Sequence, residues 1–292
     1  SSADSVFGGT GSDTLAFTGS AVRATTMLSG SGNDSIVMSG TDQGTNTLNL
    51  GHGTDTLVFT TTSKADVVNL TSTTISGAKF ITYQSDVLNA GITTGAGRDL
   101  IEFKDTATAG TIATNSGNDS IVFSNAGAVT SQIDLGSGAD SVSVLNVLDG
   151  AGAGTVLGGS GSDTFNLSTL SSAYLLGDAD VDSVNISGSL YGSTVDFGAG
   201  NEKFTLSVGA TGSSISGGAD NDTFVINASD LLTASSIQGA AGNDSVLFKG
   251  DLSGSTVFGG SGQDTFTFSA GVNNSALVSG DSGSDLMNFS ST

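Results

Sequence analysis

One short phrase recurs about every 20 residues along the chain, and this period constrains the fold more than any other feature. The phrase reads G-x-G-x-D-[S/T]-Φ-x-Φ, where Φ is an apolar residue, as at residues 9–17, 30–38 and 159–167. A fixed period of this length is typical of stacked repeats, in which each unit buries its apolar face against its neighbours. We therefore predict one continuous domain over residues 1–292 rather than two globular domains.

Each repeat divides into a glycine turn and a strand. In the copy around Asp264, residues 259–264 form a turn whose glycines are free to adopt positive φ. Residues 265–268 then alternate with period 2, as a half-buried strand does. A looser linker and a second extended run complete the repeat. The sequence predicts an all-β, right-handed parallel β-helix or β-roll of about 14 coils, each of roughly 20–21 residues.

Three columns of apolar residues are expected to fill the core. Two of them follow the acidic residue of the phrase, at its second and fourth positions downstream, as Ile101 and Phe103 follow Asp99. The third lies on the opposite strand and comprises Leu48, Ile75, Ile92, Ile112, Ile133, Val156, Leu175, Val195, Ile215, Ile237, Val257 and Val278.

The composition is strongly acidic. Asp and Glu number 28 against 7 Lys and Arg, which gives a net charge of −21, while hydrophobic residues reach 36%. That hydrophobic content is too high for a disordered acidic tail. The negative charge repels nucleic acid and anionic membranes, and no apolar stretch is long enough to span a bilayer. With 0 Cys, we expect a secreted bacterial protein, at the cell surface, that is stabilised by something other than disulfides.

The phrase also places an acidic residue in nearly every coil. Carboxylates stacked about 4.8 Å apart repel each other by roughly 1 kcal/mol per pair in water. A cation between coils would turn that repulsion into a crosslink, and Ca²⁺ accepts carboxylate and carbonyl oxygens at flexible geometry. The alternative is a metal-free turn, in which Asp side chains accept backbone N–H groups and the following Ser and Thr form a hydrogen-bond ladder.

The aspartates of the phrase are the expected metal ligands. They are Asp13, Asp34, Asp55, Asp99, Asp119, Asp140, Asp163, Asp182, Asp222, Asp244, Asp264 and Asp285. Lys79 replaces the acidic residue in the copy at residues 76–83, so we expect no cation site in that coil. Zinc is not expected, because the chain has no Cys and a single His, His52.

These phrases resemble the calcium-binding nonapeptide G-G-x-G-x-D-x-U-x of RTX (haemolysin-type) repeat proteins. The fullest matches are residues 8–13, 158–163 and 259–264, and weaker ones recur through nearly the whole chain. The resemblance implies a β-roll whose turns hold several Ca²⁺ ions between coils. It also implies secretion by bacteria, because such repeats serve toxins, proteases, adhesins and S-layer proteins. Here one glycine turn alternates with a variable linker, so we expect one ladder of ions rather than two.

The favoured function is structural: part of a surface layer, sheath, filament or adhesin stalk. The first and last strands lie at the ends of the sequence, so we expect uncapped ends that join a longer chain or stack head to tail with another copy. A carbohydrate- or ice-binding module is the alternative, with cell-surface polysaccharide as a partner. A non-catalytic repeat module of a secreted enzyme or toxin is another. We do not expect catalysis by the chain itself, because its Ser and Asp recur periodically instead of forming a triad.

Overall fold

The computed structural model describes residues 5–18, 25–39, 46–60, 63–64, 67–69, 79–84, 87–88, 91–105, 107–108, 110–124, 132–149, 154–227, 232–273 and 275–290. Throughout these residues the regular elements are β-strands, and their pairings are parallel. None of the described segments forms a helix of the length and hydrophobicity that crossing a membrane requires. The chain divides into two compact units, residues 1–146 and 147–292.

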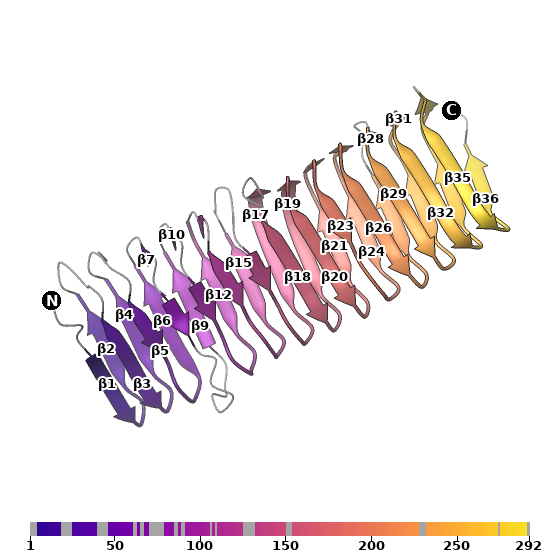
Figure 1. Ribbon diagram of the computed structural model, residues 1–292. Coiled ribbons are helices and arrows are strands. Elements are labelled where there is room, and N and C mark those ends of the chain that lie inside the picture. Colours follow the sequence, from indigo (N-terminus) through magenta and orange to yellow (C-terminus); the bar gives the residue numbers. More distant parts are fainter. Residues whose placement is uncertain are drawn as a thin grey trace. The chain divides into compact units, whose positions relative to one another are not determined.

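The first unit contains two long parallel ladders (Figure 1). One ladder consists of β1 (Ser5–Thr10), β3 (Thr26–Ser31), β5 (Thr47–Asn49), β8 (Val67–Asn69), β11 (Gly91–Thr93), β14 (Thr111–Ala113) and β16 (Gln132–Asp134). The other consists of β2 (Thr14–Phe17), β4 (Ser35–Met38), β6 (Asp55–Phe59), β9 (Lys79–Tyr83), β12 (Leu100–Phe103), β15 (Ser120–Phe123) and β17 (Ser141–Asp149). A short third ladder joins β7 (Ser63–Lys64), β10 (Val87–Leu88) and β13 (Ala107–Thr108).

The second unit repeats this arrangement. Its first ladder is β18 (Thr155–Ser160), β20 (Tyr174–Ala179), β23 (Thr194–Asp196), β26 (Ser214–Ala219), β29 (Ser236–Ala241), β32 (Thr256–Gly262) and β35 (Leu277–Gly283). The second is β19 (Thr164–Ser171), β21 (Ser183–Ile186), β24 (Lys203–Leu206), β27 (Thr223–Ile226), β30 (Ser245–Phe248), β33 (Thr265–Phe268) and β36 (Leu286–Phe289). Short strands pair beside the end of β19, namely β22 (Leu190–Tyr191), β25 (Ala210–Thr211), β28 (Leu232–Thr233), β31 (Leu252–Ser253) and β34 (Val272–Asn273).

This parallel β-solenoid confirms the predicted fold class. Successive strands pair one repeat apart, so that equivalent residues stack, as Ile101 does on Ile121 and Phe224 on Val246. The two predicted columns that follow the acidic residue are buried within each unit. They become partly or fully exposed at Leu15, Phe17, Met287 and Phe289, which belong to the first and last described strands of this ladder. Alternation with period 2 therefore identified the core face correctly.

The third predicted column is also buried, except at the partly exposed Val278, but one of its members was assigned wrongly. In the structure Val68 pairs with Leu48 on one side and with Ile92 on the other. The sequence had predicted Ile75 for this position, and Ile75 lies outside the described residues. The coil after Asp55 is longer than its neighbours, and both the pair Val67-Val68 and the pair Thr74-Ile75 have the pattern of the strand. The pattern alone could not decide between them.

Aromatic rings stack along the core of the first unit. Phe59, Tyr83, Phe103 and Phe123 are buried, with ring centroids 4.5, 5.1 and 4.7 Å apart in that order. Adjacent rings lie within 6° of parallel. In-register pairing of β6, β9, β12 and β15 produces this arrangement. Such pairs add about 0.5–1.5 kcal/mol each beyond the burial of their area.

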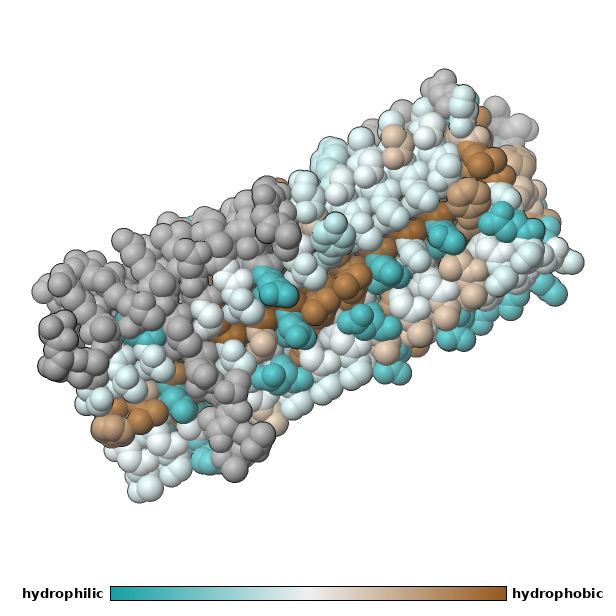
Figure 2. All heavy atoms as spheres, in the orientation of Figure 1, coloured by the Kyte–Doolittle hydropathy of each residue, from teal (hydrophilic) through white to brown (hydrophobic). Residues whose placement is uncertain are grey.

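The surface of the second unit is mainly polar on the face shown in Figure 2. Hydrophobic side chains there form a narrow band bordered by polar ones, rather than a broad patch. The chemistry of the solenoid therefore has to be sought in its turns, where the acidic residues lie.

Candidate functional site

In each unit the structure brings the predicted aspartates into one column, at the turn between the two long ladders. The first unit holds Asp13, Asp34, Asp55, Asp99, Asp119 and Asp140, and the second holds Asp163, Asp182, Asp222, Asp244, Asp264 and Asp285. Within the columns ten of these side chains are at most 3% exposed, while Asp13 and Asp285 are partly exposed. The glycine turn thus carries the carboxylates inward rather than into solvent.

In most of these residues one carboxylate oxygen accepts a hydrogen bond from the preceding coil, which holds the coils together. The backbone N–H of Asp34 donates to Oδ1 of Asp55, one coil further on, at 2.9 Å. The same bond recurs through both units, for instance from Asp99 to Asp119 at 2.7 Å and from Asp244 to Asp264 at 2.8 Å. This ladder is a form of the metal-free hydrogen-bonded turn that the sequence left open, and it uses only half of each carboxylate.

In several of these residues the other carboxylate oxygen is buried without a hydrogen bond. This holds for Oδ2 of Asp34, Asp182, Asp244 and Asp264. A buried polar atom with no partner costs about 1–3 kcal/mol, and more when it is charged. Native proteins rarely leave such atoms without a partner, so a repeated row of them requires an explanation.

The electrostatics agree with this shortage of partners. Burial raises the pKa of Asp119 and of Asp182 to about 7, and neighbouring carboxylates of the column contribute in the same direction. Burial likewise raises the pKa of Asp244 to about 6. Backbone hydrogen bonds to the carboxylates lower these values but do not offset the burial. The ionised form of these three carboxyl groups is therefore disfavoured near neutral pH unless their charge is compensated.

Glu202 is a member of the column that was not among the predicted ligands. It is 2% exposed, and its N–H donates to Oδ1 of Asp222 at 2.9 Å, as an aspartate of the ladder would. Its carboxyl group is buried, and the carboxyl group of Asp222 lies beside it. The signal was present in the sequence, because residues 198–202 match the phrase with Glu in the acidic position.

Lys79 occupies the column as the sequence predicted. It pairs in register with Asp55, and its N–H donates to Oδ1 of Asp99 at 2.7 Å. Its ammonium points back to the preceding coil, where Nζ lies 2.7 Å from Asp55 Oδ2 and 2.6 Å from the carbonyl oxygen of Gly53. Both side chains are buried, at 1% and 0% exposure. In this coil the second oxygen of the aspartate does have a cationic partner.

The turn keeps its backbone conformation even where glycine is absent. In the degenerate copy that ends at Asp182, Asp178 and Asp180 adopt φ of 77° and 73°. Asp220 and Ala240 likewise have φ of 75° and 82° at positions where the phrase has glycine. Residues other than glycine rarely adopt such angles, at a cost of roughly 1–2 kcal/mol each. The packing of neighbouring coils therefore imposes the turn on these residues.

Apart from the Lys79 ammonium, the described acidic side chains of the column offer oxygen atoms. No three His, Cys, Asp or Glu side chains converge as a metal-binding group among the described residues. Carbonyl oxygens complement the carboxylates instead: a Cβ on Gly158 would lie 2.7 Å from both Asp163 Oδ2 and Gly177 O. Carboxylate and carbonyl oxygens suit a hard cation such as Ca²⁺, whereas zinc favours nitrogen and sulfur. The column therefore fits a hard cation chemically.

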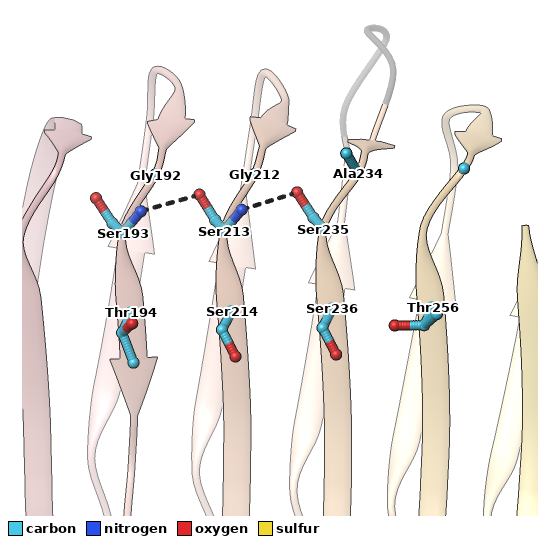
Figure 3. Close-up of a pocket in the computed structure, with 11 residues that line it drawn as sticks. Gly192, Ser193, Thr194, Gly212, Ser213, Ser214, Ala234, Ser235, Ser236 and Thr256 are labelled. Carbon is cyan, nitrogen blue, oxygen red and sulfur yellow. Dashed lines mark hydrogen bonds between the residues drawn. The ribbon is translucent and has the colours of Figure 1, made fainter.

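A second ladder follows the opposite turn of the second unit, and it is uncharged. Figure 3 shows the N–H of Ser193 donating to Oγ of Ser213, and that of Ser213 to Oγ of Ser235. Ser235 continues the series to Ser255. These hydroxyls satisfy buried N–H groups without a charge, so this turn does not need a cation. The adjacent groove is lined by the hydroxyls of Thr194, Ser214, Ser236 and Thr256.

No family model matches the chain, and no curated protein matches its sequence. Among solved structures it is similar to one titled as the X-ray crystal structure of a hyperactive, Ca²⁺-dependent, β-helical antifreeze protein from an Antarctic bacterium. The TM-score is 0.64, the identity is 17%, and the match covers 85% of each chain. An identity this low shows the fold alone.

Proposed function

We propose that this chain is a non-catalytic, extracellular structural solenoid of RTX-like type, whose coils are locked by one ladder of Ca²⁺ ions. The observation that carries the proposal is the row of buried Oδ2 atoms without hydrogen bonds, as in Asp34, Asp182 and Asp244. A cation that binds these oxygens would compensate their charge and link successive coils. The net charge of −21 favours accumulation of cations around the chain.

Calcium suits this column better than other common metals. It accepts about six to eight oxygens at flexible geometry, which a turn can supply as carboxylates and backbone carbonyls. Magnesium requires a nearly octahedral arrangement and retains water, which a buried column cannot easily accommodate. The Ca²⁺ dependence stated for the structurally similar antifreeze protein is consistent with this choice.

The structural role rests on repetition. The described polar side chains of the column serve the stacking of coils, and similar contacts recur from coil to coil. His52 lies exposed in the turn before Asp55, where a variable residue of the phrase belongs. A surface layer, filament or adhesin stalk uses a rigid, calcium-stabilised solenoid of this kind, and secretion exposes it to millimolar calcium.

Calorimetric titration with Ca²⁺ and Mg²⁺, combined with thermal melts followed by circular dichroism, tests the calcium lock. We expect several Ca²⁺ ions per chain and a melting temperature that falls after exhaustive chelation. Unchanged strand content and melting temperature in chelator would refute the lock. Electron microscopy in calcium and after chelation then tests the scaffold role, because calcium-dependent filaments or sheets are expected and dispersed particles in both conditions would contradict self-assembly.

Ice binding is the second candidate, favoured by one surface row. Thr194, Ser214, Ser236 and Thr256 occupy the same register position on β23, β26, β29 and β32. Adjacent strands lie about 4.8 Å apart, so their hydroxyls can hold a regular row of water molecules. Tyr174 precedes the row and Leu277 follows it.

Thermal hysteresis of the purified protein in calcium tests this candidate. Replacing Ser214 with Lys would abolish hysteresis if the row binds ice. The matched change Thr223→Lys, on the exposed side of β27, would leave it intact. A protein without hysteresis that instead binds polysaccharide on a glycan array would favour the carbohydrate-binding alternative.

A further inference from the structure

The basic residues of the chain are distributed unevenly. Of the 7 Lys and Arg, the structure describes the surroundings of five side chains. Arg98, Lys104, Lys203 and Lys249 are exposed, whereas Lys79 is 1% exposed. Burying an ammonium costs several kcal/mol unless a close counter-charge and further hydrogen bonds compensate it. Lys79 therefore needs a specific structural reason to lie inside the column.

The contacts of Lys79 resemble those expected of a metal ion. Its Nζ contacts one carboxylate oxygen, Asp55 Oδ2 at 2.7 Å, and one turn carbonyl, Gly53 O at 2.6 Å. These are the two kinds of oxygen that Ca²⁺ accepts in proteins. Oδ2 of Asp34, the preceding column member, has no such partner. The ammonium thus lies against the atoms that a cation would use.

We propose that Lys79 is a tethered cation, which takes the place of Ca²⁺ between its own coil and the coil of Asp55. This inference rests on the proposed calcium lock. The side chain reaches back across one coil, so its positive charge is linked covalently to the repeat that it secures. The contact between these two coils then persists without calcium. The chain binds one ion fewer than it would with an acidic residue at position 79.

The same geometry identifies ligands in the other coils. The carbonyl that Lys79 contacts belongs to the residue two positions before the aspartate. Equivalent pairs in the first unit are Gly32 with Asp34 and Gly97 with Asp99. We assign these carbonyl and Oδ2 atoms to the ions of their coils.

The decisive variant is Lys79→Asp, which restores the acidic phrase. Calorimetry and metal analysis after gel filtration in calcium should find one more Ca²⁺ per chain than in the wild type. Hydrogen exchange of residues 55–59 and 79–83 should become sensitive to chelator. In the wild type we expect these segments to exchange at least about tenfold more slowly in chelator than residues 222–226 and 244–248.

Two further variants guard against a simple folding defect. Lys79→Met removes the charge and should abolish the protection of residues 55–59 in chelator, with no gain of an ion. Lys104→Met is the matched control, because Lys104 is about half exposed and pairs with Glu102 only at 3.5 Å. This control should leave both ion count and exchange unchanged.

The possible results separate the two proposals. If the wild type binds calcium but Lys79→Asp binds no additional ion, the tethered-cation proposal is wrong and the calcium lock stands. Equal loss of protection in all four wild-type segments on chelation would also overturn it, even if Lys79→Asp failed to fold. If neither protein binds calcium, the lock itself is wrong, and Lys79 forms only a structural ion pair.

Discussion

The acidic columns of the two units differ in what lies beside a buried carboxylate. In the first unit, the Asp55 carboxylate contacts the ammonium of Lys79, so a negative and a positive charge are buried together. In the second unit, Glu202 and Asp222 are adjacent column members, and both contribute carboxyl groups. Burial, together with the Asp222 carboxyl, raises the pKa of Glu202 well above its usual range.

The backbone of the turn is the same whether an ammonium or a second carboxyl group lies beside the carboxylate. In both places the N–H of one column residue donates to Oδ1 of the next, at 2.7 Å from Lys79 and 2.9 Å from Glu202. Charge compensation is therefore a separate layer of stabilisation, added to a common hydrogen-bonded ladder. At Asp55 the compensating charge is the ammonium of Lys79, and at Asp222 we propose that it is bound calcium.

Calcium removal should cause the largest loss of stability, and the loss should be greater around Asp222 than around Asp55. At 100 times its Kd, each saturated site adds about 2.7 kcal/mol, so the loss of several sites lowers stability strongly. Scanning calorimetry in calcium and in chelator measures the total effect. Hydrogen exchange should show residues 222–226 losing protection before residues 55–59. The reverse order would break the comparison.

The calcium-free protein should also lose stability as the pH rises. Burial raises the folded-state pKa of Asp244 to about 6 and that of Asp182 to about 7. The folded protein then binds protons more tightly than the unfolded chain, so stability is greatest below about pH 4 and falls as the pH passes through 6 to 7. Thermal melts in chelator between pH 4 and 8 measure this slope. Calcium should flatten it at neutral pH, and a calcium-free melting temperature that rises with pH would contradict the prediction.

Asp55→Asn should destabilise the protein by about 3–5 kcal/mol, because it leaves the Lys79 ammonium buried without a carboxylate. The loss should be similar in calcium and in chelator. Urea denaturation under both conditions measures it. Asp134→Asn is the matched control on the exposed side of β16 and should change stability by at most about 0.5 kcal/mol. A loss at Asp55 that calcium fully reverses would argue against internal compensation.

The effect of Asp222→Asn on the free energy of unfolding should have opposite signs in chelator and in calcium. The amide keeps an oxygen that can accept the N–H of Glu202, but it removes one of two adjacent buried carboxylates. In chelator we expect a gain of about 1 kcal/mol from reduced repulsion. In calcium we expect a loss, because a charged ligand is gone. If denaturation curves give a stability change of the same sign in both conditions, calcium does not compensate the charge of Asp222.

The smallest effect concerns the turn backbone. Ala240→Gly should stabilise the protein by about 1 kcal/mol, because alanine is strained at its φ of 82°. Ala241 has no positive φ, so Ala241→Gly should instead destabilise by about 0.5–1 kcal/mol. Melting temperatures of the two variants test whether packing of the coils imposes the turn without help from the ion. Equal effects would contradict that view.

Fixed spacing from the acidic residue made much of this architecture predictable. The position of Ile101 or Phe224 in the core follows from its distance to the aspartate, and the structure buries both. The same spacing placed Lys79 in the column. It could not show that the side chain turns back to Asp55, because a flexible four-carbon stem has no directional signature in sequence.

Other features lacked a signal or carried two competing signals. Strands as short as Leu190–Tyr191 have too few residues to display alternation, so the ladders of short strands in the two units were not predicted. The Ser193–Ser213–Ser235 ladder was missed because serine is common throughout the chain. In the longer coil after Asp55, the pairs Val67-Val68 and Thr74-Ile75 fitted the strand pattern equally well. We predicted Ile75 from the sequence, whereas in the structure Val68 pairs with Ile92.

The stacked rings of the first unit also give the protein an internal optical probe. The chain has 0 Trp and 3 Tyr, and Tyr174 and Tyr191 are about half exposed. Tyr83 is fully buried between Phe59 and Phe103. Its strand begins at Lys79, so the chiral near-ultraviolet signal of this tyrosine reports on order beside the buried ion pair. Loss of that signal during thermal unfolding would give the temperature at which this part of the first unit melts, without any attached label.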